Sequence, residues 1–136
     1  MRLISLTACV ISTVSFGAFA SADSSEIVKP TLVLKQIVEG MPNENKKEVG
    51  VFAASFKPGD KTPTHTHNFP VTVYVLEGAF TLALKGKDPI TVKAGEAMVE
   101  PANVEMTGFN PSTEDITKVV IYYVNTPGSP FLNPMH

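Results

Sequence analysis

The chain is divided into short apolar runs, and each run ends at residues that favour turns. Residues 79–84 show the strand period most clearly, because Phe80, Leu82 and Leu84 alternate with smaller side chains. No stretch of useful length has the spacing of an amphipathic helix. We predict strands at residues 31–38, 49–56, 71–76, 79–84, 90–93, 96–100, 104–109 and 118–124, with a hairpin turn at 85–88. Such a series without an internal repeat predicts an all-β fold, a small antiparallel β-barrel or jelly roll.

The first 22 residues have the features of a secretory signal peptide. Arg2 supplies a positive charge, residues 3–19 are almost wholly apolar or small, and Ala18-Phe19-Ala20 and Ala20-Ser21-Ala22 are both suitable cleavage sites. The alternative is an uncleaved anchor, but the apolar run is short for a spanning helix and no stop-transfer charges follow it. We therefore predict a signal peptide at residues 1–22, a single domain at residues 23–136, and a periplasmic or secreted protein without stable membrane insertion.

Composition limits what the exported domain can bind. The chain has 136 residues, of which 43% are hydrophobic and 18% charged, enough for one domain with one core. Cleavage removes Arg2 and Cys9, the only cysteine, so the mature chain has ten basic against thirteen acidic residues, a formal charge of −3, and no disulfide. A mildly acidic chain without a basic cluster is not expected to bind nucleic acid.

Two histidines one residue apart, His65 and His67, are the clearest candidates for chemistry. In an extended chain, residues i and i+2 point to the same face, so both imidazoles can ligate one metal ion. The alternative is that the pair binds no metal and is simply part of a polar, half-exposed junction between a loop and a strand. The one further histidine in the sequence is the C-terminal His136.

The residues around this pair resemble the two motifs of the cupin family. Gly59, His65, His67 and Gly78 have the spacing of the first motif, a glycine, His-x-His, a glutamate and a glycine. Gly95, Pro101 and Asn110 have the spacing of the second motif, in which Asn103 stands in place of a glycine. The resemblance implies a β-barrel with a metal site inside it. It also implies small-molecule chemistry, since dioxygenases, isomerases and lyases all occur in the family.

Two positions depart from the family pattern. Val71 stands where the first motif has its glutamate, and Met106 stands where the second motif has its histidine. Strand parity from His65 places His65, His67, Val71, Val73 and Val75 on one face, the barrel interior. Since valine cannot ligate a metal, another side chain would have to supply the missing charge.

Glu100 is the best candidate for that charge, because it stands immediately before Pro101, near the ligand strand of the second motif. Some small cupins that lack the first-motif glutamate carry Glu-Pro at this position, so the resemblance implies this role for Glu100. With His65 and His67 it would complete a set of two histidines and one carboxylate, which suits Fe and is tolerated by Mn, Ni or Zn. The alternative is a solvated carboxylate at a strand end. Met106 could instead be a thioether ligand and would then favour Cu(I), although methionine more often fills a core. Glu105 should be a surface charge.

Three functions remain open from the sequence. The first is an exported cupin that binds one divalent metal ion and acts on or binds a small molecule, with His65, His67 and Glu100 as ligands. The second is a degenerate, non-catalytic cupin that binds a small molecule or a partner. The third is an exported copper-binding protein that uses His65, His67 and Met106. The sequence does not decide whether the protein is an enzyme.

The C-terminal residues 126–136 are rich in proline but include Phe131 and Leu132. Large apolar side chains in such a tail should pack over an open sheet edge or onto a partner subunit. We expect a homodimer formed through edge strands.

Overall fold

The computed structural model describes residues 30–135, and the residues from Thr31 onward belong to one compact unit. The predicted signal peptide, residues 1–22, lies outside the described residues. This part of the chain contains strands and no helix, so the predicted all-β class is confirmed. No helix among the described residues is long and apolar enough to cross a membrane. The strands are β1 (Glu48–Phe56), β2 (His65–Thr66), β3 (Val71–Glu77), β4 (Ala79–Leu84), β5 (Ile90–Lys93), β6 (Ala97–Glu100), β7 (Met106–Phe109), β8 (Thr117–Asn125) and β9 (Asn133–Pro134).

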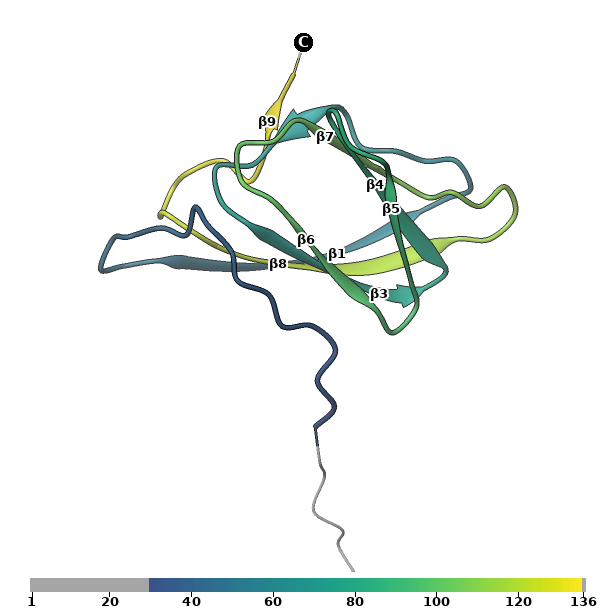
Figure 1. The fold of residues 1–136 in the computed structure, drawn as a ribbon, viewed down its shortest axis with the longest axis horizontal. Helices are drawn as coiled ribbons and strands as arrows, with labels where there is room; N and C mark the ends of the chain where they lie inside the picture. The colour runs from purple at the N-terminus through teal and green to yellow at the C-terminus, as the bar shows by residue number, and fades with distance from the viewer. Residues whose placement is uncertain (1–29, 136) are drawn as a thin grey trace, which may run out of the picture. The chain divides into compact units, whose positions relative to one another are not determined.

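The strands form two antiparallel sheets that face each other across the interior (Figure 1). One sheet has the order β1-β8-β3-β6 and the other β5-β4-β7-β2-β9. Strands far apart in sequence therefore pair, as β1 does with β8. This is the predicted antiparallel barrel or jelly roll.

The core lies between the two sheets. In β3 the side chains of Val71, Val73 and Val75 are buried, while the residues between them are only half buried. His65 and His67 are buried as well, so the predicted inward face of five residues is confirmed. Full burial of one valine contributes roughly 1.5–3 kcal/mol, so this face is a major source of stability. The other large core residues are Phe69, Phe80, Leu82, Leu84, Met98, Met106, Val119 and Tyr123.

One predicted strand is wrong, and two strands were not predicted. Residues 31–38 form no strand, and Ile37 is 97% exposed, because no neighbouring strand pairs with this apolar segment among the described residues. The strands β2 and β9 have two residues each, too few for a periodic pattern to reveal them. The hairpin turn at 85–88 is confirmed, since the amide of Lys87 donates to the carbonyl of Leu84 at 3.1 Å.

The connection from β3 to β4 passes through Gly78, which has a φ of +74°. A Cβ atom at this position would lie 2.5 Å from the carbonyl oxygen of Ile116 and 3.0 Å from the hydroxyl of Thr117. Only glycine fits, for both conformational and steric reasons. Directly after the turn, the carbonyl of Ala79 in β4 accepts a hydrogen bond from the hydroxyl of Thr117 in β8 at 2.6 Å.

We predict that Gly78→Ala destabilises the fold far more than Gly86→Ala. Gly86 has nearly the same φ, +75°, but a Cβ there would meet nothing within 4 Å. The left-handed backbone alone should cost about 1 kcal/mol in Gly86→Ala, while Gly78→Ala should cost roughly 2 kcal/mol more through the clash. Urea unfolding of both variants measures the difference. Equal losses would show that the close approach at Gly78 does not exist in solution.

Candidate metal centre

Three predicted ligand residues converge inside the barrel. His65 lies in β2, His67 follows that strand directly, and Glu100 ends β6. One ligand atom from each residue lies within 4.8 Å of the others. The Nε2 atoms of His65 and His67 are 3.1 Å apart, and Nε2 of His67 is 3.1 Å from Oε2 of Glu100. The three residues, called the triad below, are 3%, 1% and 5% exposed in that order.

The loop after Glu100 is hydrogen-bonded to the segment that carries His65 and His67. The amide of Asn103 donates to the carbonyl oxygen of His67 at 2.7 Å. Asn103 has a φ of +58°, a conformation that glycine adopts freely and that asparagine tolerates better than most residues. This is the position where the cupin motif has a glycine, so the replacement preserves the backbone turn that holds Glu100 opposite His67.

Both histidines use their second ring nitrogen to contact a backbone carbonyl. Nδ1 of His65 lies 2.8 Å from the oxygen of Pro63, and Nδ1 of His67 lies 2.7 Å from the oxygen of Phe131. A carbonyl oxygen can only accept, so each Nδ1 must carry the proton and donate it. In the neutral imidazole this leaves Nε2 with a lone pair. Such carbonyl partners are the usual means of orienting a histidine toward a metal.

Three hydrogen-bond acceptors therefore lie close together at the centre of the triad. Nε2 of His67 lies 3.1 Å from Nε2 of His65 and 3.1 Å from the carboxylate oxygen of Glu100, with no proton between them while both rings are neutral and Glu100 is ionised. Buried acceptors that face each other repel, and a cation between them would relieve the repulsion. One extra proton on Nε2 of His67 would be shared between two acceptors, whereas a divalent metal ion could be held by all three. The donor set fits a metal site.

The structure explains how the carboxylate is replaced. Val71 in β3 is the direct cross-strand partner of Glu100 in β6. Directly opposite side chains have Cβ atoms about 4.5–5.5 Å apart, so a carboxylate missing from β3 is supplied by the neighbouring strand. The negative charge thus stays in the same part of the interior, and Val71 becomes part of the apolar core.

Met106, the fourth candidate ligand, lies on the other side of the triad. It is the cross-strand partner of His65 in the β2–β7 pair and is 1% exposed. It packs within the main apolar cluster. A role of Met106 as a ligand stays a prediction.

Glu105 lies at the surface, as predicted. Its carboxylate is 2.7 Å from the ammonium of Lys85. The hydrogen bond between them, and then the Coulombic attraction, raise the pKa of Lys85 above its ordinary value. Glu105 therefore serves an exposed ion pair and not the interior.

Phe131 is the site residue whose role the sequence did not reveal. Its carbonyl accepts from His67, and its ring lies 4.9 Å from the ring of His67 and 5.0 Å from that of Tyr123, measured between centroids. The prediction that this tail residue packs over an open edge is correct in outline. The signal was a large aromatic residue in a proline-rich tail, but nothing local indicated contact with a histidine.

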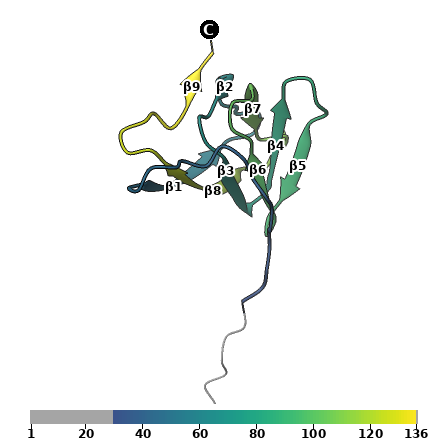
Figure 2. The ribbon, with the colours of Figure 1, turned by 60° about the vertical axis from the view of Figure 1, so that its left-hand side comes forward.

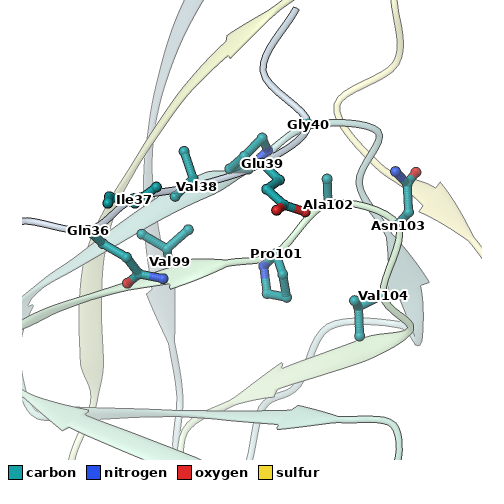
Figure 3. A pocket seen from close by; sticks show the side chains of 11 residues that line it. Gln36, Ile37, Val38, Glu39, Gly40, Val99, Pro101, Ala102, Asn103 and Val104 are labelled. Carbon is teal, nitrogen blue, oxygen red and sulfur yellow. The ribbon is translucent and has the colours of Figure 1, made fainter.

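Three of the cavities on the described part of the chain have volumes of about 460, 590 and 230 Å³. None of these three is lined by a triad side chain. Figure 3 shows the first, in which residues 36–40 lie along one side and Val99 and Pro101 along the other. Pro101 follows Glu100 directly, so this cavity adjoins the triad without opening onto it.

Comparison with known proteins agrees with these observations. Residues 52–122 match the family described as the cupin domain. The chain belongs to the cupin family. No protein of curated function matches it. The matched region contains the whole triad, whereas Phe131 lies beyond it.

Solved structures resemble this cupin at the level of the fold. An RmlC-like cupin with a double-stranded β-helix fold from Methanocaldococcus jannaschii is 22% identical, with a TM-score of 0.54 over 69% of this chain and 94% of that one. A cupin-like protein from Thermotoga maritima is 24% identical, with a TM-score of 0.53 over 64% of each chain. The DMSP lyase DddQ from Ruegeria pomeroyi is 12% identical, with a TM-score of 0.54. The match covers 63% of this chain and only 42% of the lyase.

We predict that Glu100→Gln stabilises the metal-free protein. The glutamine amide can donate to Nε2 of His67, where the carboxylate can only face it as a second acceptor. One hydrogen bond gained in this way should add about 1 kcal/mol to the free energy of unfolding, measured with urea in the presence of a chelator.

Glu105→Gln is the matched control, because it removes an exposed ion pair and should change stability by less than about 0.5 kcal/mol. A loss of stability in Glu100→Gln would contradict the acceptor-only description. It would show that a proton lies between His67 and Glu100 in the metal-free protein.

Proposed function

We propose that this cupin binds one divalent transition-metal ion through His65, His67 and Glu100 and holds a small molecule at that ion. The observation that carries the proposal is the set of three buried acceptors whose histidines are both oriented by backbone carbonyls. Two imidazoles and one carboxylate form the set that suits Fe(II), with Mn, Ni and Zn as further candidates. A bound ion would polarise a substrate oxygen or activate water or dioxygen.

The protein itself orients the metal ligands and excludes water from the site. The carbonyls of Pro63 and Phe131 fix both Nε2 atoms toward Glu100, so the ligands are organised before an ion arrives. Phe69 and Phe131 place aromatic rings beside His67, 6.0 and 4.9 Å away between centroids. Low polarity around the site strengthens the electrostatic attraction between the ion and its ligands.

The residues around the triad also suggest the class of small molecule. Outside the triad, the described residues bury polar side chains of threonine and asparagine but no further charged one. A ligand would therefore be held by oxygen atoms on the ion and by apolar contacts with the barrel wall. A small organic acid or carbonyl compound with an apolar body fits this description.

A non-catalytic binding module is the second candidate. The replacements at Val71 and Met106 favour it, since both remove family ligands from the interior. Such a protein would use the same apolar wall but would not need a metal ion. Metal content distinguishes this candidate from the first.

Copper binding by His65, His67 and Met106 is the third candidate. The observation that favours it is the cross-strand pairing of Met106 with His65. A soft thioether would favour Cu(I), whereas the carboxylate of Glu100 favours harder ions. The identity of the metal, and the ligand whose loss abolishes binding, separate the two metal sites.

We predict near-stoichiometric Fe, Mn, Ni or Zn in the protein exported by its own host and purified without a histidine tag or chelator. His65→Ala/His67→Ala should abolish binding, Glu100→Gln should weaken it at least tenfold, and Met106→Leu should leave it unchanged. Elemental analysis provides the metal content. Intact mass of the same sample tests the predicted removal of residues 1–22.

Loss of metal in Met106→Leu but not in Glu100→Gln would support the copper site instead. A metal-free wild-type protein that folds normally would contradict both metal proposals and leave the binding module.

We also propose that two copies associate through the outer face of the sheet β1-β8-β3-β6. Val49 and Val51 in β1 are 62% and 63% exposed, and Val51 lies beside the exposed Tyr122 of β8. The charged neighbours Lys118 and Glu77 pair with each other at 2.7 Å, so the face offers little net charge. The outer edge of β1 pairs with no described strand, and an antiparallel strand can pair with its own copy about a two-fold axis.

Val51→Lys should therefore convert a dimer into a monomer, because it places a charge on both the apolar face and the free edge. Light scattering coupled to size exclusion measures the mass. Ile90→Lys is the control, since Ile90 is also exposed but lies on β5, at an edge of the other sheet. A monomeric wild type at micromolar concentration, or a dimeric Val51→Lys, would refute this interface.

A further inference from the structure

The C-terminal segment, residues 126–135, returns to the strand that carries His65. Its last part, β9, pairs with β2, and Figure 2 shows the two strands side by side. The amide of Met135 donates to the carbonyl of Thr64 at 2.8 Å, and the side chain of Asn133 donates to that of Asn68 at 2.9 Å. The segment is thus attached on both sides of the His65–His67 pair.

Between these attachments, Phe131 is inserted into an aromatic cluster. Its ring lies 4.8 Å from that of Phe52 and 6.5 Å from that of Phe69, in addition to its contacts with His67 and Tyr123. Its carbonyl is the acceptor that defines the tautomer of His67. The same residue therefore both covers the triad and orients one of its ligands.

With the segment in place, the triad is nearly inaccessible. His65, His67 and Glu100 are only 3%, 1% and 5% exposed. A small molecule needs a path to the proposed ion. An element that already contacts His67 is the natural place for that path to open.

The C-terminal segment is also held less firmly than the rest of the barrel. The strand β9 has only two residues, of which Pro134 has no amide proton to donate. Most residues of the segment are exposed or half buried. Elements with short pairing and little burial open at low free energy, whereas the long β1–β8 pair does not.

We propose that residues 126–135 are a releasable cover of the metal centre and that Phe131 is the positioning residue for His67. Docked, the segment closes the triad and holds His67 in the tautomer that presents Nε2 to the ion. Released, it opens the triad to metal and to a small molecule. This inference rests on the proposed metal site.

Thermodynamic linkage makes the coupling between docking of the segment and metal binding reciprocal. If docking of the segment raises metal affinity by orienting His67, bound metal must favour the docked segment by the same factor. Loss of a carbonyl or carboxylate partner of a ligating histidine typically lowers metal affinity 10–100-fold. The same range is expected here when the segment is removed.

The test compares four variants with the wild type: a chain ending at Thr126, Phe131→Ala, Phe131→Leu and Phe52→Ala. The probe is Zn²⁺ alone, measured by competition with a chromophoric chelator and by its release rate into excess EDTA. The truncated chain and Phe131→Ala should bind zinc 10–100-fold more weakly and release it faster. Phe131→Leu should recover part of the loss.

Phe52→Ala is the matched control. Phe52 packs against Phe131 and Tyr123 in the same cluster but makes no ring contact with His67. It should bind zinc within about threefold of the wild type, a difference of roughly 0.7 kcal/mol or less. Thermal unfolding of every variant identifies any that fails to fold. If the truncated chain or Phe131→Ala fails to fold, the comparison rests on Phe131→Leu, which should still bind zinc more weakly than the wild type.

A second readout does not depend on metal. In the metal-free protein, ¹⁵N–¹H correlation spectra of the imidazoles should show His67 with its proton on Nδ1. The truncated chain should show a mixture of tautomers, while His65, whose partner is Pro63, should not change.

The outcomes separate the two proposals. A wild type that binds no zinc, yet shows the tautomer change on truncation, refutes the metal site and supports Phe131 as the positioning residue. Zinc bound with the same affinity and release rate in all folded variants, with His67 unchanged, overturns the inference about the C-terminal segment.

Discussion

The two hydrogen bonds from Nδ1 of His65 and His67 to backbone carbonyls determine what the interior of this cupin can bind. Each bond uses the proton of a neutral ring, so the remaining nitrogen faces Glu100 as an acceptor. Three converging acceptors in a core repel one another, and a cation between them would relieve that repulsion. The proposed metal site and the proposed role of the C-terminal segment both depend on this constraint.

The structure also shows how a chain can depart from its family's motifs and keep their geometry. Glu100 on β6 lies directly opposite Val71 on β3, so a carboxylate is present beside the position where the family motif has its glutamate. Asn103 adopts the left-handed backbone that a glycine would otherwise provide. In both cases the backbone and the location of charge are retained while the residue that supplies them changes.

Most of the barrel follows from local patterns in the sequence, and so does the pair His65 and His67. Glu100, the third residue of the triad, was indicated by its position next to Pro101 and by the family resemblance. Alternation in residues 71–76 and 79–84 located β3 and β4, and the parity from His65 identified the buried face, because strand period is a local property. Residues 31–38 have the same apolar character but form no strand, since pairing depends on a neighbour that the sequence does not reveal. The contact of Phe131 with His67 spans 64 residues and could not be found from either segment alone.

X-ray absorption spectroscopy of the metal-loaded, full-length protein tests the central claim most directly. We predict that the ligand atoms are nitrogen and oxygen only, with the multiple-scattering pattern of two imidazoles, and that Glu100→Gln loses one oxygen ligand. A sulfur atom among the ligand atoms would assign Met106 as a ligand and contradict the proposed site. A ligand set with fewer than two imidazoles would show that the orientation of His65 and His67 by Pro63 and Phe131 serves another purpose.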